Sequence, residues 1–152
     1  MTVLVACGII SCDSPLAPLP VTAPEEFEFS ISGFLMATTT WTIKGDTLVF
    51  LRYPIEYPRV PRDSLWSIPT AEQWNVFWSA ADKAGIRRWK GRYVEKDMLD
   101  GMGWRLQVRN GTLAIESSGA NAYPDRDGRE HKGQWTREFR SFVSALQQLS
   151  GN

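Results

Sequence analysis

Acidic side chains gather near the middle of the chain, where Glu95, Asp97 and Asp100 follow one another closely. Two carboxylates held at a suitable separation can cleave a glycosidic bond, one as general acid and the other as nucleophile or base. The same carboxylates also suit the solvated rim of a turn, because Asp100 begins the turn-forming sequence Asp100-Gly101. Asp97 and Asp100 are therefore predicted binding residues, and a carboxylate-dependent hydrolase is one alternative function.

A second acidic segment, from Asp125 to His131, contains part of a calcium-binding pattern. It lacks the third acidic ligand and the spaced glutamate of an EF-hand loop, and Arg126 and Arg129 interrupt it. His131 is the only histidine, and neither a nucleophile nor an oxyanion-stabilising element accompanies it. The chain has no glycine-rich phosphate loop. We therefore predict no catalytic residue, no metal site and no cofactor, and we expect a non-catalytic protein.

The segment Gly119-Ala120-Asn121-Ala122-Tyr123-Pro124 is the stretch that core packing explains least. Glycine and alanine permit close backbone approach, while Asn121 and Tyr123 carry hydrogen-bonding groups. The segment leaves a predicted core strand next to the turn that precedes Trp104. Trp104, Asn121 and Tyr123 are therefore predicted binding residues. In the alternative interpretation, Asn121 and Tyr123 only satisfy backbone groups where the chain crosses to the last helix.

The charge balance limits the partners that the chain can bind. With 17 basic and 17 acidic side chains the formal net charge is zero, so no field of one sign is available to hold a nucleic acid. The proline-rich stretch from Pro54 to Asp63 carries Arg59 and Arg62, with Arg52 beside it. This stretch either covers a sheet edge or presents Arg59 and Arg62 to an anionic protein partner.

The N-terminal residues form an apolar run that is too short to span a membrane and that ends in small residues, which is typical of a signal peptide. Ile9-Ile10-Ser11-Cys12 resembles the lipobox of bacterial lipoproteins, and Leu4-Val5-Ala6-Cys7 fits the same pattern. The resemblance implies a lipidated Cys12, a signal-like segment 1–11 and a proline-rich tether 12–25. No lysine or arginine precedes Cys12, which departs from such signals. The alternative is a buried N-terminal strand that contains both cysteines.

A second resemblance concerns the C-terminal half of the chain. Asp100-Gly101 before Trp104, followed by Gly119, Asn121 and Tyr123-Pro124, resembles segments of small bacterial lipoproteins of unknown function. This resemblance implies no activity.

Hydrophobic periodicity predicts the elements that would position these residues. Phe27, Phe29 and Ile31 alternate with polar residues, as in a half-buried strand. Thr38–Lys44 and Thr47–Tyr53 form a hairpin around Gly45-Asp46, which sets Ile43 opposite Leu48 and Trp41 opposite Phe50. Irregular structure is expected from Pro54 to Asp63. The seven tryptophans indicate a core built on large rings or, alternatively, rings exposed to a ligand.

Two amphipathic helices are predicted. Thr70 and Gln73 form a capping box before an apolar stripe that begins at Trp74, and Gly85 ends this helix. The second helix runs from about Trp135 to Leu149, and Gly151 ends it.

The strand pattern between the helices predicts a three-stranded meander. A strand over Trp89–Lys96 is followed by strands Trp104–Arg109 and Thr112–Ser118, joined by an Asn110-Gly111 turn. That turn pairs Arg109 with Thr112, and it sets Arg105 opposite Glu116 as a cross-strand ion pair.

Together these elements predict one α+β domain over residues 26–152, an antiparallel sheet of about five to six strands with both helices on one face. We expect a lipid-anchored, non-catalytic binding module of the bacterial envelope, held at the membrane and facing an envelope protein. The alternatives are an inhibitor or accessory subunit of an envelope enzyme and the hydrolase.

Overall fold

The protein is described by a computed structural model that covers residues 16, 18–33, 36–55, 60–97 and 101–151. The elements in chain order are β1 (Glu26–Gly33), β2 (Met36–Lys44), β3 (Thr47–Tyr53), β4 (Asp63–Ser67), α1 (Ala71–Lys83), the 3₁₀ helix η1 (Ile86–Arg88), β5 (Arg92–Val94), β6 (Met102–Asn110), β7 (Leu113–Ala120), β8 (Ala122–Pro124), β9 (Glu130–Lys132) and α2 (Arg137–Ser150).

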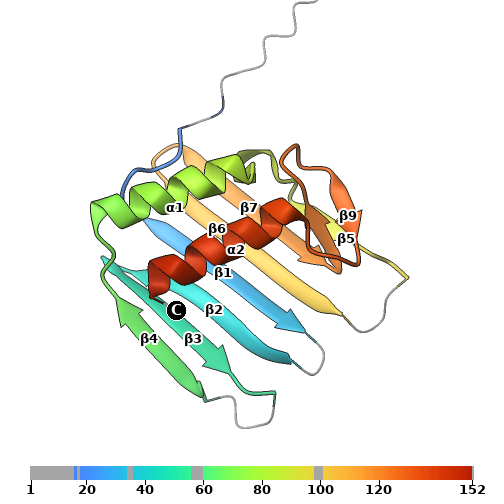
Figure 1. The fold of residues 1–152 in the computed structure, drawn as a ribbon, viewed down its shortest axis with the longest axis horizontal. Coiled ribbons are helices and arrows are strands. Elements are labelled where there is room, and N and C mark those ends of the chain that lie inside the picture. Colours follow the sequence, from blue (N-terminus) through green and yellow to red (C-terminus); the bar gives the residue numbers. More distant parts are fainter. Residues whose placement is uncertain (1–15, 17, 34–35, 56–59, 98–100, 152) are drawn as a thin grey trace, which may run out of the picture.

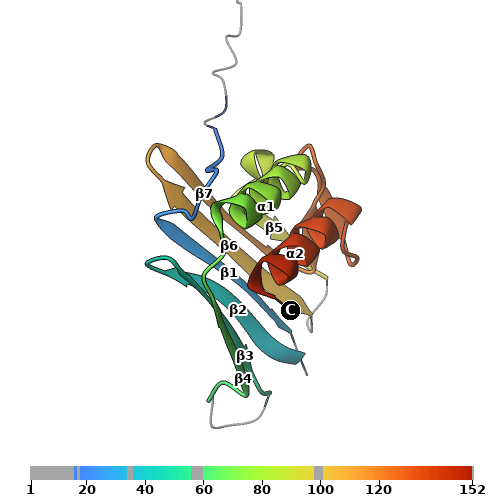
Figure 2. The same ribbon diagram turned by 60° about the vertical axis from the view of Figure 1, so that its left-hand side comes forward.

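The main sheet has seven strands in the order β4-β3-β2-β1-β6-β7-β5, and β8 and β9 form a separate two-stranded sheet. Its pairs are antiparallel except for β5 with β7. Both helices cover the same face, over β1, β6 and β7, and the sheet curls so that β3 and β4 extend beyond them (Figures 1 and 2). The predicted α+β architecture with two helices on one face is confirmed.

The first hairpin forms as the sequence predicts. Ile43 pairs with Leu48 and Trp41 pairs with Phe50, because a two-residue turn at Gly45-Asp46 joins β2 to β3. Gly45 has a φ of 66°, which a residue with a side chain rarely adopts. β1 adds to the other edge of β2 and carries Phe27 and Phe29 into the core.

No element was predicted for the residues that follow the irregular stretch Pro54 to Asp63, and the structure has a strand there. β4 begins at Asp63 and pairs with β3 through its full length. Nearly all of its side chains are exposed, so the strand lacks the alternation of buried and exposed residues that marks a half-buried strand.

The predicted register of the second hairpin is wrong by two residues. Asn110 pairs with Leu113, so the turn residues are Gly111 and Thr112 rather than Asn110 and Gly111. Of these two only Gly111 has a positive φ, as a type II′ turn requires. Glu116 therefore faces Gln107, and the predicted cross-strand pair of Arg105 with Glu116 does not form.

The predicted meander is also wrong at its first strand. β5 has only three residues and pairs with β7 in parallel, so β7 lies between β5 and β6. Trp89 and the two residues after it lie outside any strand, and Trp89 is the buried C-cap of η1.

The core lies between the two helices and the sheet. The capping box of Thr70 and Gln73 starts α1, as predicted, and the second helix begins two residues later than predicted, with Thr136 as its N-cap. Phe139 of α2 is fully buried among aromatic rings from the sheet and from the loops around it.

The N-terminal segment joins the domain before β1 begins. The indole nitrogen of Trp78 donates a hydrogen bond of 2.9 Å to the carbonyl oxygen of Thr22, and Leu19 and Ala23 pack against the core. The C-terminal part of the predicted tether therefore lies against α1. None of the helices in the described part of the chain is long and apolar enough to cross a membrane.

Candidate binding groove

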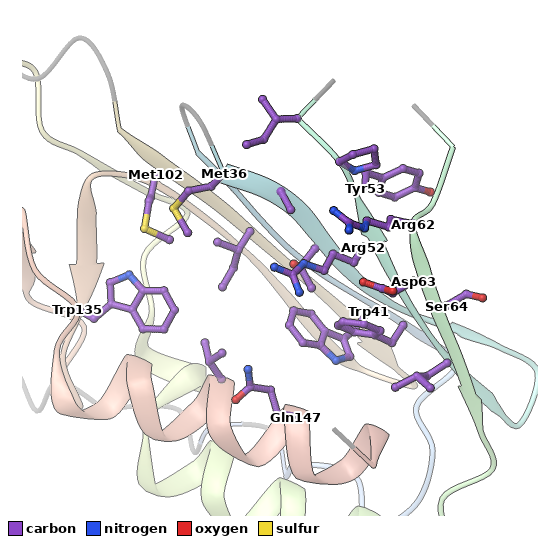
Figure 3. Close-up of a pocket in the computed structure, with 18 residues that line it drawn as sticks. Met36, Trp41, Arg52, Tyr53, Arg62, Asp63, Ser64, Met102, Trp135 and Gln147 are labelled. Atoms are coloured by element: carbon purple, nitrogen blue, oxygen red, sulfur yellow. The ribbon is translucent and has the colours of Figure 1, made fainter. Parts of the chain in front are cut away.

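An open groove lies between α2 and the concave side of strands β2, β3 and β4, with a volume of about 1630 Å³ (Figure 3). It forms where the sheet curls away from α2 beyond β2, although α2 still contacts β3 and β4. The groove is lined by Ile31, Met36, Ala37, Thr39, Trp41, Phe50, Arg52, Tyr53, Pro54, Ile55, Arg62, Asp63, Ser64, Leu65, Met102, Trp135, Val143 and Gln147.

The strand register arranges the floor of the groove in cross-strand rows. One row runs from Trp41 through Phe50 to Leu65 and is apolar. The next row along the strands runs from Thr39 through Arg52 to Asp63 and is polar. Because paired residues share a face of the sheet, both rows point toward α2. A ligand in the groove would thus meet apolar and charged groups side by side.

The α2 side of the groove supplies Val143 and Gln147, and Trp135 precedes the helix (Figure 3). Close to the C-terminus of α2 the sheet and the helix are tied together, because the indole nitrogen of Trp41 donates a hydrogen bond of 3.2 Å to Ser150 Oγ. At the other end Met36 and Met102 lie side by side, each about 3.3 Å from the position that a Cβ would take on Gly33.

Arg52 and Arg62 carry the positive charge of the groove, and we call them the arginine pair. Among the residues that the structure describes, neither guanidinium has a carboxylate or a hydrogen-bond acceptor within bonding distance. Other arginines of the chain do have one, such as Arg109 with Glu26 at 3.7 Å. Figure 3 shows both guanidinium groups on the β3–β4 side of the groove. The pair is thus available to a ligand that brings its own anionic group.

The three binding residues predicted in the second half of the chain lie elsewhere. Trp104, Asn121 and Tyr123 are all buried, and none of them lines the groove. The indole nitrogen of Trp104 donates a hydrogen bond of 2.9 Å to the carbonyl oxygen of Ala122. Burial raises the pKa of the Tyr123 hydroxyl, and a hydrogen bond with Trp135 partly offsets that rise. A binding role for these three residues stays a prediction.

Asn121 holds the start of β6 against the segment that leaves β7. Its Oδ1 accepts a hydrogen bond of 2.7 Å from the Met102 backbone N–H, and its own N–H donates to the carbonyl oxygen of Met102. Its φ of 50° is the only positive value among the non-glycine residues described. A side chain on Gly101 would overlap the Asn121 amide. These contacts agree with the alternative in which Asn121 satisfies backbone groups.

The remaining predicted site residues are distributed over the chain. Asp97 is exposed in the turn after β5, where its N–H donates to Glu95 Oε1 at 3.4 Å. Arg62 lines the groove. Asp100, Arg59 and Cys12, together with the alternative lipidation residue Cys7, lie outside the described residues, so the proposed pairing of Asp97 with Asp100 stays a prediction.

The β8–β9 hairpin brings Asp125 and His131 together, with Asp125 Oδ2 3.0 Å from His131 Nε2. Burial alone would raise the pKa of the Asp125 carboxyl, but the hydrogen bonds from His131 and from the backbone N–H groups of Arg129 and Asp127 outweigh it and hold that pKa below its usual range. In the described ranges no three His, Cys, Asp or Glu side chains are placed to hold a metal ion. The contact between Asp125 and His131 therefore links the two sides of the β8–β9 hairpin.

Comparison with protein-family models and with curated proteins finds no match for this chain. Sequence reasoning placed Trp41 and Phe50 on the covered face of a hairpin but did not recognise an open face beside them. One signal was present in the sequence of β3. The alternation that places Leu48 and Phe50 on the helix-facing side of the strand also places Arg52 there. Because arginine is seldom fully buried, it indicates that the helices leave this part of the face uncovered.

Proposed function

We propose that this protein is a non-catalytic binding module and that the groove holds a polypeptide segment of its partner. The observation that carries the proposal is the combination of exposed apolar side chains in the groove with the arginine pair, for which the described residues offer no acceptor within bonding distance. Apolar side chains of a ligand would pack on the exposed groove residues Met36, Ile55 and Leu65, while an acidic side chain or terminal carboxylate would meet Arg52 and Arg62.

The size of the groove favours a polypeptide over a small molecule. Pockets for small ligands usually have volumes of about 300–1,000 Å³ and enclose most of the ligand. The groove is larger, at about 1630 Å³, and is open along one side. An extended segment of a protein fills such a space without being enclosed. An inhibitor or accessory subunit of an envelope enzyme would use the same surface, since Arg62 belongs to it.

We expect that peptides selected from a random display library against this protein combine apolar residues with an acidic residue. Replacing both Arg52 and Arg62 with glutamine should weaken their binding by about tenfold to a hundredfold, because a hydrogen bond to a charged group contributes about 1.5–3 kcal/mol. Isothermal titration calorimetry on each selected peptide measures the change. Affinity should also fall at high salt, since the guanidinium groups are exposed.

The matched control is Arg105→Gln. Arg105 is exposed on β6 and adjoins Trp104 and Leu106, which are buried, so it points to the face that the helices leave bare. Its replacement should leave peptide affinity unchanged. Selected peptides without acidic residues, or peptides that bind the arginine-pair variant as tightly as the original protein, would contradict the proposal.

We propose further that the module is anchored to a membrane of the bacterial envelope through a lipid on Cys12. The support is the resemblance of Ile9-Ile10-Ser11-Cys12 to a lipobox. In bacteria fed with a labelled fatty acid, the protein should carry the label, and Cys12→Ala should lose both the label and the membrane fraction. Cys7→Ala serves as the control. Equal membrane association of the Cys12→Ala form would refute the anchor.

A further inference from the structure

The two edges of the main sheet are built differently. At one edge β5 has only three residues, and the N–H of Val94 donates to the Glu130 carboxylate at 3.0 Å (Figure 1). A short strand whose outer N–H meets a side chain gives an approaching strand little to pair with. This edge is protected.

At the opposite edge β4 has five residues and, within the described part of the chain, pairs with β3 alone. Leu65 and Trp66 are 40% and 63% exposed, and Ile68 just beyond the strand is 67% exposed. The strand contains neither lysine nor proline, the residues that usually keep an edge from pairing, and Asp63 at its first position is its only charge. A free row of backbone groups beside large apolar side chains is a surface that suits an added strand.

We propose that β4 is a dimer interface, at which it pairs antiparallel with β4 of a second copy of this chain across a twofold axis through Leu65. In this register Leu65 faces Leu65 of the second copy, Trp66 faces Ser64, and Asp63 faces Ser67. No two like charges lie opposite each other, so the strand is complementary to itself, as a twofold interface requires.

Two features favour a second copy over another protein. The chain has no formal net charge, so two copies do not repel each other as strongly charged molecules would. The paired sheets would also end on both sides at a β5, the edge that is already protected. Association therefore stops at a dimer and does not continue into a filament. The dimer does not require a ligand in the groove, although Leu65 also lines the groove.

Sedimentation velocity of the full chain tests the proposal, with Cys7 and Cys12 replaced by serine so that no thiol or lipid contributes. We expect a concentration-dependent mass that reaches twice that of the 17.2 kDa chain. Leu65→Glu should raise the dimer dissociation constant at least tenfold, because two carboxylates then meet at the axis, and should leave the circular dichroism spectrum unchanged. Val76→Glu, at an apolar residue of α1 that is 61% exposed and so more exposed than Leu65, should leave the dimer intact.

A second variant keeps the test independent of how Leu65→Glu folds. Leu65→Cys in the same serine background should form a disulfide-linked dimer on mild oxidation, and Val76→Cys should not. A monomer at every concentration overturns the proposal. So does a dimer that Leu65→Cys fails to cross-link, since the interface would then lie elsewhere.

Discussion

Replacing Phe139 with alanine is expected to lower the free energy of unfolding by about 3–5 kcal/mol, the usual cost of removing a buried aromatic ring. The Phe139 side chain is fully buried, and its ring centroid lies 5.0–6.1 Å from those of five aromatic residues. These are Phe29, Trp89, Trp104, Tyr123 and Trp135. Because they come from separate elements, the cavity cannot be filled by moving one of them. Urea unfolding followed by circular dichroism measures the loss.

The control for this variant is Val76→Ala on α1. Val76 is 61% exposed, so its truncation should change the free energy of unfolding by no more than about 0.5 kcal/mol. If Phe139→Ala cost less than about 1 kcal/mol, the central position of this ring in the core would be wrong.

Replacing Gly85 with alanine should cost more than replacing Gly151, although both glycines follow a helix in nearly the same conformation. Their φ values are 78° and 77°. Gly151→Ala carries only the conformational cost of a left-handed alanine, about 1–2 kcal/mol. A Cβ on Gly85 would in addition overlap the carbonyl oxygen of Arg126, whereas nothing lies within 4 Å at Gly151. We expect Gly85→Ala to cost about 3 kcal/mol or more.

The comparison of the two glycine variants isolates the contact between the end of α1 and the β8–β9 hairpin. Thermal unfolding of both proteins under identical conditions gives the difference. Equal losses for Gly85→Ala and Gly151→Ala would mean that the hairpin yields without cost, and that its close approach to α1 does not stabilise the domain.

The helices and the first hairpin could be predicted because local sequence determines them. A capping box and an apolar stripe fix α1, and a two-residue turn fixes the register of β2 and β3. β5 and β4 could not be predicted in the same way. β5 pairs with a strand that follows it by more than twenty residues, and β4 carries no alternating pattern.

In the β6–β7 hairpin, the face on which each side chain lies was predicted correctly, but its cross-strand partner was not. A shift of two residues leaves every side chain on its face, since the pleat repeats every second residue. The apolar residues Leu106 and Ile115 were therefore placed in the core correctly. Their cross-strand partners were predicted wrongly. Asn110-Gly111 and Gly111-Thr112 both make acceptable two-residue turns, and the local sequence favours the first.

The groove lay beyond sequence reasoning because it depends on how far the sheet curls past α2. Periodicity assigns Trp41 and Phe50 to a covered face but does not say where the cover ends. The segment from Gly119 to Pro124 is the opposite case, because sequence reasoning predicted binding residues where the structure has buried side chains. Its unusual composition reflects crowding, as a side chain on Gly119 would overlap the indole of Trp104.

The position of β1 has a mechanical consequence. The chain enters this strand directly from the N-terminal segment, and β1 lies in the middle of the sheet, hydrogen-bonded to β2 on one side and β6 on the other. A pull along β1 from the N-terminus loads both ladders in shear, so their hydrogen bonds must break together instead of one after another. A chain tethered at that end would carry tension directly into the central strand of its sheet.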